Sequence, residues 1–169
     1  MSTRSVRQRL AAVYATLPTV DCAGLCAYSC TTFPVPRAEA REILRRTRVE
    51  IGLSPQRRTP TESCPLLTDD RRCGAYDIRP LICRLWGITT GMICSHGCQP
   101  TRLLDLRETY ALMADVYEIG GQHRDAQRFR WACTRGGLDR FAPVINAAAR
   151  GDISAAQVER IITEMLHQT

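Results

Sequence analysis

The chain has 169 residues, of which 44% are hydrophobic and 24% are charged, the balance of a globular domain rather than of a disordered chain. The net charge is +6 and all 23 basic residues are arginines, which excludes lysine nucleophiles and lysine Schiff bases. No apolar run approaches the roughly 20 residues that span a bilayer, and residues 1–10 lack the apolar segment of a secretory signal, so we expect a cytoplasmic protein.

Two helices are predicted in the first third of the chain. Residues 4–18 carry apolar side chains at helical spacing and end at Pro18. Residues 37–51 form an arginine-rich helix that lies between prolines and Gly52. We expect its arginine face to be solvated and its apolar stripe to be buried, with Ala40, Ile43 and Leu44 in that stripe.

The segment from Gly52 to Pro100 has a different pattern. It contains five prolines and no sustained helical period, and only short strands or single helical turns are expected, around residues 73–78 and 81–86. A loop of this length inside a compact domain needs another source of order. Metal ligation would supply that order, because ligand bonds can replace a missing core.

The C-terminal third is predicted to be helical again. Apolar periodicity predicts helices over residues 101–118, 123–134, 138–149 and 154–166, the first of which ends at a pair of glycines. The sequence therefore predicts one mainly α domain over residues 1–169, with about six helices. It places a cysteine-rich, loop-dominated metal-binding region at 22–98 and a helical part at 101–169.

Cysteine is the residue type that carries the chemistry. In a reducing compartment, clustered cysteines are more often metal ligands or catalytic groups than disulfides. Thiolates select iron–sulfur clusters, zinc or Cu(I). Eight of the nine cysteines lie close enough in sequence to form two four-cysteine sites or one larger cluster. We expect these ligands to be Cys22, Cys26, Cys30, Cys64, Cys73, Cys83, Cys94 and Cys98.

Helical geometry limits how the first three cysteines can be used. In one straight helix, Cys22 and Cys30 would be about 12 Å apart at about 1.5 Å per residue, which is too far for one compact cluster. Either the segment is a loop, as Gly24 permits, or Cys30 serves a different metal from Cys22. A three-cysteine group of this kind also leaves room for an iron with an open coordination position.

The second cysteine group has the most specific pattern. Residues 63–86 read SCPLLTDDRRCGAYDIRPLICRLW. This segment resembles the YkgJ family of cysteine-cluster proteins, described as zinc- or iron-chelating domains, whose pattern has a cysteine hook followed by CP-(F/L)-L, an RC-x-(I/A)-Y step and RP-x-x-CR. The family's hook usually ends in adjacent cysteines, which this chain lacks.

The resemblance implies metal ligation by residues that match the family pattern. Cys22, Cys26 and Cys30 correspond to the hook, and Cys64, Cys73 and Cys83 to the core pattern. The ligand role of Cys94 and Cys98 comes from their spacing alone. The family implies little about activity, because the domain occurs in proteins of differing roles, including flagellin lysine methylases.

Several neighbouring residues are candidates for a second layer around the metal. A four-cysteine [4Fe–4S] centre is anionic, and Arg79 and Arg84 lie beside ligand cysteines in the sequence. Tyr76 is expected to pack over the centre and exclude water. His96 could replace a cysteine as ligand, although a loop histidine that faces water is the more common case. The isolated Cys133 is expected to be a buried thiol without a metal.

Three classes of function remain. The first is an iron–sulfur protein with a redox, electron-transfer or accessory role beside a partner enzyme, holding two [4Fe–4S] clusters or one larger cluster. The second is an enzyme that uses an open iron for sulfur, methyl or radical chemistry. The third is a zinc-binding or redox-sensing regulator that binds nucleic acid, which the charge permits but no DNA-binding motif indicates.

Overall fold

The structure is a computed structural model, and it describes residues 3–22, 24–25, 27, 30, 34–51, 63–90, 92–134, 136, 140, 143–144, 157, 160 and 164. Pairing between extended segments in this part of the chain is limited to isolated β-bridges. The mainly α class predicted from the sequence is therefore confirmed. The elements are α1 Thr3–Ala15, α2 Arg37–Thr47, the 3₁₀ turn η2 Tyr76–Ile78, α3 Leu81–Leu85, α4 Leu106–Ile119 and α5 His123–Ala132.

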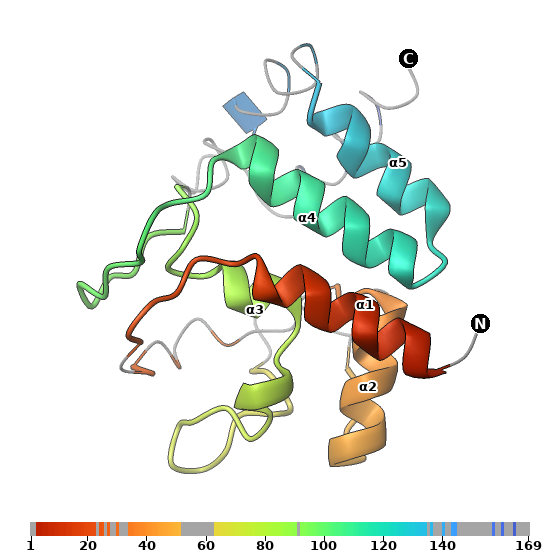
Figure 1. The fold of residues 1–169 in the computed structure, drawn as a ribbon. Coiled ribbons are helices and arrows are strands. Elements are labelled where there is room, and N and C mark those ends of the chain that lie inside the picture. Colours follow the sequence, from red (N-terminus) through yellow and green to blue (C-terminus); the bar gives the residue numbers. More distant parts are fainter. Residues whose placement is uncertain are drawn as a thin grey trace.

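Helix α4 is the centre of the helical arrangement. It packs along α5 and also contacts α1, α2 and α3. Figure 1 shows α4 and α5 side by side, with α1 running along the opposite side of α4 and α2 beyond α1. The predicted helices over 138–149 and 154–166 lie outside the described residues, apart from isolated positions.

Both N-terminal helices end earlier than the periodicity predicted. α1 stops at Ala15, after which the N–H groups of Thr16 and Leu17 bond carbonyl oxygens three residues back, at 3.1 and 3.2 Å. α2 stops at Thr47 because Arg48 adopts a left-handed conformation with φ 63°, and its N–H bonds the Leu44 carbonyl. This conformation ends a helix even though the apolar pattern continues to Ile51.

The buried stripe of α2 also differs from the prediction. Ala40 and Ile43 are completely buried as expected, but Leu44 is 36% exposed. Glu39 takes part in the buried face instead, with only 2% of its surface accessible. The outer face is solvated, and its Glu42 pairs there with Arg45, Arg46 and Arg7 of α1.

Helix α4 begins at Leu106, five residues after the predicted start at Thr101. Asp105 is the N-cap, and with Glu108 it forms a reciprocal capping box. The preceding residues are extended: the Thr101 N–H bonds the Thr19 carbonyl at 2.8 Å, and Leu104 bridges Thr89. The segment therefore joins the N-terminal and central parts of the chain rather than extending the helix.

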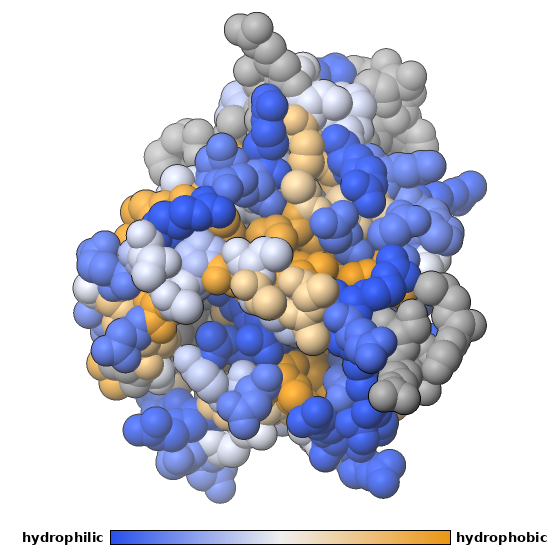
Figure 2. Space-filling model, viewed as in Figure 1, coloured by the Kyte–Doolittle hydropathy of each residue, from blue (hydrophilic) through white to orange (hydrophobic). Residues whose placement is uncertain are grey.

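Apolar side chains form two clusters. The larger one lies between α1, α3, α4 and α5 and includes Leu10, Leu81, Leu85, Ile88, Leu104 and Val116. The smaller one lies between α2 and the cysteine-rich segment and includes Ala40, Ile43, Ile51, Leu66 and Ala75, with Cys64 and Cys73 packed against it. Hydrophilic residues cover most of the face in Figure 2, with hydrophobic ones in small groups between them. Among the described helices, none has the length and apolar character that crossing a membrane requires.

Candidate metal centre

Two distant parts of the sequence meet at Cys30 and Cys64. The backbone N–H of Cys64 donates to the carbonyl oxygen of Cys30 at 2.9 Å. The chain between these two residues includes 31–33 and 52–62, which the structure does not describe. Cys64 then opens a tight turn, since its own carbonyl accepts the N–H of Leu67 at 3.0 Å. This turn carries the chain back toward the smaller apolar cluster.

A short antiparallel contact brings Cys73 back to the same place. Leu67 and Cys73 form an isolated bridge, and the N–H of Gly74 donates to the Leu66 carbonyl at 2.8 Å. A β-carbon on Gly74 would lie 3.3 Å from that carbonyl oxygen, so the close approach favours glycine. The sequence CPLLTDDRRCG therefore folds as one closed loop that places Cys64 and Cys73 together.

Cys83 completes a four-cysteine group from the middle of α3. The pKa of its thiol is raised to about 12, mainly by desolvation in the surrounding protein and then by charge repulsion from the nearby Cys64, Cys73 and Cys30. The Cys83 residue is nevertheless exposed at the surface. Four thiols from separate segments thus gather at one point near the surface.

A buried carboxyl group fixes the helix that carries Cys83. Glu39 Oε1 accepts the Leu81 N–H at 2.7 Å and the Tyr14 hydroxyl at 2.5 Å. Burial raises the pKa of Glu39 to about 7, while these hydrogen bonds and the charge of Arg84 act in the opposite direction. Glu39 therefore connects α1, α2 and α3 directly beneath the cysteine group.

The arginines predicted to surround the metal have different contacts. Arg84 donates to the backbone carbonyls of Arg79 at 2.9 Å and Asp77 at 2.7 Å, and its guanidinium lies 4.2 Å from the centre of the Tyr14 ring. Arg84 therefore closes the turn between η2 and α3. Arg79 stacks on Tyr76 at 3.8 Å, and Tyr76 itself is 44% exposed. The Nε atom of Arg79 is buried and has no hydrogen-bond partner in the described part of the chain.

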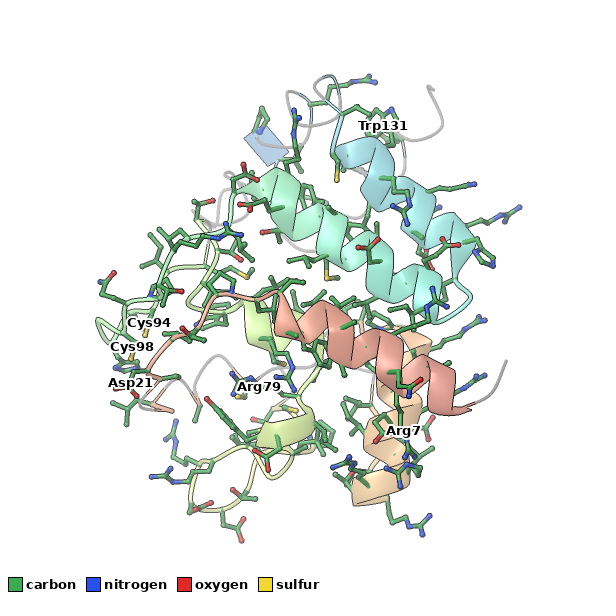
Figure 3. All side chains as sticks on the ribbon, viewed as in Figure 1. Arg7, Asp21, Arg79, Cys94, Cys98 and Trp131 are labelled. Atoms are coloured by element: carbon green, nitrogen blue, oxygen red, sulfur yellow. The ribbon has the colours of Figure 1, made fainter. Side chains whose placement is uncertain are left out.

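A second group of cysteines lies at another edge of the molecule. Val20 bridges Pro100 in antiparallel orientation, and Cys22 lies two residues after Val20 while Cys98 lies two residues before Pro100. Figure 3 shows Cys94 and Cys98 together beside Asp21, away from Arg79. Residues 22, 24, 25 and 27 are not α-helical, and Gly24 has φ +70°. At the described positions the segment is therefore not one straight helix, while Cys30 acts on the pKa of Cys83 together with Cys64 and Cys73.

The other candidate ligands have the following positions. Cys26 lies outside the described residues, and His96 is exposed in the loop between Cys94 and Cys98. Cys133 is half-buried rather than buried, and its thiol donates to the carbonyls of Phe129 at 3.2 Å and Arg107 at 3.5 Å. None of the eight described cysteines is in a disulfide. Among the described residues, no three Cys, His, Asp or Glu side chains already stand in an arrangement that holds a metal ion.

Glu39 and Tyr14 are the site residues that sequence reasoning missed. Glu39 belongs to a helix whose charged face was expected to be solvated, and Tyr14 was not singled out in the first predicted helix. The one signal was that Glu39 lies on the same helical face as Ile43, four residues later. That signal is weak, because long charged side chains often border an apolar stripe.

Comparison with known proteins identifies the cysteine-rich segment. Residues 21–99 match the family model CxxCxxCC, described as “Putative zinc- or iron-chelating domain”. The resemblance drawn from the cysteine pattern is therefore confirmed for this segment, which is slightly less than half of the chain. No curated protein and no solved structure matches the chain significantly.

Proposed function

We propose that this protein is an iron–sulfur protein with a redox, electron-transfer or accessory role, and that Cys30, Cys64, Cys73 and Cys83 hold its cluster. The observation that carries the proposal is the gathering of these four thiols from separate segments around Cys83. Four thiolates are the ligand set of a [4Fe–4S] cluster and also of a structural zinc ion.

The mutual repulsion of the four thiols supports a metal centre rather than a disulfide. The thiols repel one another when ionised, as the raised pKa of Cys83 indicates, and a bound cation removes that repulsion. Closure of the four side chains on a metal would accompany its binding, because metal binding and local folding are coupled.

Arg79 favours an iron–sulfur cluster over zinc. Its buried Nε is a donor without an acceptor in the described residues, four positions before Cys83. Leaving such a donor unpaired costs about 1–3 kcal/mol, and more for a charged group. The sulfides of a cluster are hydrogen-bond acceptors, whereas a zinc ion adds none.

The surroundings of the four thiols support a redox role. An iron–sulfur cluster supplies reversible one-electron transfer when bound. The chain excludes water on one side through Leu66, Ala75 and Ile43, while Cys83 is exposed on the other. A cluster so close to the surface would be within reach of a docked redox protein or enzyme, the partner class that we propose. Reduced thiols also fit a cytoplasmic location.

The remaining cysteines of the segment are also proposed as ligands. Cys22, Cys94 and Cys98 are not among the cysteines that act on the pKa of Cys83, and Cys26 lies outside the described residues. We therefore expect metal beyond the first cluster, either as a second cluster or as a separate ion.

Metal and sulfide analysis of protein purified without oxygen tests the proposal. We expect about four irons and four acid-labile sulfides for each [4Fe–4S] cluster, and a brown colour. Cys83→Ser should lose this iron and sulfide, and Cys133→Ser should keep both. Colourless protein with zinc and without sulfide would refute the iron–sulfur assignment and make the segment a structural zinc module.

A further inference from the structure

The positive charge of the chain is concentrated on two helices. Residues 3–15 and 37–48, which are α1 and α2 with the residue that ends α2, contain eight arginines and two glutamates. The rest of the chain contains fifteen arginines and fifteen aspartates or glutamates. The whole formal net charge of +6 therefore lies on these two segments. An arginine excess that reflected composition alone would be spread along the chain.

The two glutamates of these helices compensate little of this charge at the surface. Glu39 is buried, with 2% of its surface accessible, and its carboxylate accepts hydrogen bonds inside the fold. Glu42 faces solvent, but three arginines share it at distances between 2.8 and 3.0 Å, namely Arg7, Arg45 and Arg46. One carboxylate balances only one of these three positive charges.

The exposed arginines of α1 and α2 form one surface. Arg37, Arg41 and Arg45 are four residues apart, which places them on one side of α2 at intervals of about 6 Å along the helix axis. Arg7 reaches from α1 toward α2, as Figure 3 shows, and joins this surface through Glu42. We name as the α1–α2 basic face the exposed Arg7, Arg37, Arg41, Arg45, Arg46 and Arg48.

Half of the α1–α2 basic face has no carboxylate partner within the part of the chain that the structure describes. Arg37, Arg41 and Arg48 take part in no ion pair there. A guanidinium group binds phosphate through paired N–H donors and keeps its charge at every physiological pH. The α1–α2 basic face therefore has the composition of a phosphate-binding surface.

The row of arginines on α2 favours nucleic acid over an acidic protein. A nucleic acid backbone carries one negative charge on every phosphate, in a linear and regular series. An acidic protein presents carboxylates at positions that its own fold sets. Arginines repeated at intervals of about 6 Å along one side of a helix complement the linear series.

The absence of an available aromatic side chain favours a duplex over a single strand. Tyr14 is the only aromatic residue in the sequences of α1 and α2. Its hydroxyl bonds Glu39, and the guanidinium of Arg84 lies 4.2 Å from the centre of its ring. Proteins that bind single strands use exposed aromatic side chains on which bases stack. A helix surface also suits B-form DNA, because its major groove admits a helix and that of duplex RNA is deep and narrow.

We propose that the α1–α2 basic face binds double-stranded DNA through its phosphates, without reading the base sequence. The proposal goes beyond the proposed redox function and does not depend on it. Ala40 and Ile43, on the opposite side of α2, belong to the apolar cluster against which Cys64 and Cys73 pack. DNA and the proposed metal centre would therefore lie on opposite sides of one helix.

Fluorescence anisotropy of a short labelled DNA duplex, titrated with the full-length protein at several NaCl concentrations, tests the proposal. The logarithm of the binding constant should fall linearly with the logarithm of the salt concentration, with a slope of about −4. Each neutralised phosphate contributes about 0.9 to this slope, and α2 with its final residue offers four arginines in one row. Duplexes of different base composition should bind equally. No binding at about 50 mM salt, or a slope shallower than about −2, would overturn the proposal.

Paired variants locate the binding surface. Arg41→Gln with Arg45→Gln should weaken binding more than about tenfold and make the slope shallower by about two, since each lost phosphate contact removes about one. Arg124→Gln with Arg128→Gln is the matched control, because it removes the same charge at the same spacing from exposed positions on α5. It should remain within about threefold of wild type. Glutamine has nearly the helix propensity of arginine, and unchanged iron, sulfide and helical content verify folding. Arg37→Gln is a second variant and should make the slope shallower by about one.

Three other results would overturn the proposal. Equal weakening by the two paired variants would show that net charge alone attracts DNA. Tighter binding of single-stranded DNA or duplex RNA would identify a different nucleic acid. Displacement of the duplex by polyglutamate at equal charge concentration would make this an acidic-protein surface. Iron analysis remains a separate test: protein without iron refutes the proposed cluster and leaves the DNA measurement valid.

Discussion

The backbone N–H of Cys64 donates a hydrogen bond of 2.9 Å to the carbonyl oxygen of Cys30. This contact assigns Cys30 to the group that contains Cys64, Cys73 and Cys83, although Cys30 is closer in sequence to Cys22. The hook is therefore divided: its last cysteine belongs to one group, and its first cysteine lies beside the loop of Cys94 and Cys98.

The division of the hook predicts different phenotypes for its two described cysteines. Cys30→Ser should lose cluster iron and soluble yield together, as Cys64→Ser should, because metal binding and folding are coupled. Cys22→Ser should retain the cluster iron. Iron, sulfide and soluble yield of the three variants, measured side by side, check this. Equal iron loss in Cys22→Ser and Cys30→Ser would contradict the grouping.

Glu39 predicts a pH dependence of stability. Its pKa is about 7 in the folded state, above the ordinary value of 4.5, so the folded protein binds more protons than the unfolded chain between these values. The contribution of Glu39 to the free energy of unfolding is therefore full below about pH 4.5, falls as the pH rises, and is lost near pH 7. Glu39→Gln does not titrate, and its stability relative to wild type should rise across this window by up to about 3 kcal/mol.

Glu42→Gln is the matched control on the same helix. Hydrogen bonding to Arg45 lowers the pKa of the solvent-facing Glu42 to about 2, so this carboxyl is ionised in both the folded and the unfolded state above about pH 5. Urea unfolding at several pH values measures the free energy of unfolding. Its difference from wild type should be constant with pH for Glu42→Gln and should change with pH for Glu39→Gln. Parallel profiles for wild type and Glu39→Gln would show that Glu39 titrates normally.

Arg79 is predicted to tune the proposed cluster. Arg79→Gln removes a positive charge and a buried donor, which should lower the reduction potential by an amount on the order of tens of millivolts, since a tenfold change for one electron is about 59 mV. Arg72→Gln is the control, because the Arg72 side chain is 73% exposed and pairs only loosely with Asp70, at 3.9 Å. Spectroelectrochemistry measures both potentials. Equal potentials in the two variants would assign Arg79 a purely structural role.

The capping box of α4 is predicted to contribute to stability independently of metal. Asp105 accepts the Glu108 N–H at 2.7 Å, and Glu108 accepts the Asp105 N–H at 3.0 Å. Asp105→Ala should cost about 1 kcal/mol of the free energy of unfolding. Asp105→Asn keeps a capping oxygen and should lose less. Denaturant unfolding measures the difference, and metal content should be unchanged in both.

Cys133 is predicted to be irrelevant to metal binding. Its thiol donates to the Phe129 carbonyl at 3.2 Å, a bond that a serine hydroxyl can replace. Cys133→Ser should therefore keep wild-type metal content and change stability by no more than about 1 kcal/mol. A loss of metal in this variant would show that the C-terminal part of the chain supplies a ligand.

Local signals in the sequence account for most of the helices. Apolar periodicity located α1, α2, α4 and α5, and where η2 and α3 lie the sequence allowed short strands or single helical turns, of which the helical turns are present. The ends of α1 and α2 and the start of α4 were wrong, and the last two have different reasons. The capping box of Asp105 and Glu108 is readable in the sequence and would have moved the start of α4. The left-handed Arg48 at the end of α2 has no such signal.

The sequence by itself determined the chemistry of the site. It contains eight clustered cysteines in a given order, and thiolates bind a narrow set of metals. Only the tertiary structure decided how the thiols are grouped and that Glu39 is buried beneath them. Both depend on contacts between residues far apart in the chain, such as Cys30 with Cys64 and Glu39 with Leu81. Spacing along a chain cannot specify these contacts, since a loop of given length can close in many ways, and the packing of α2 against α3 selects one of them.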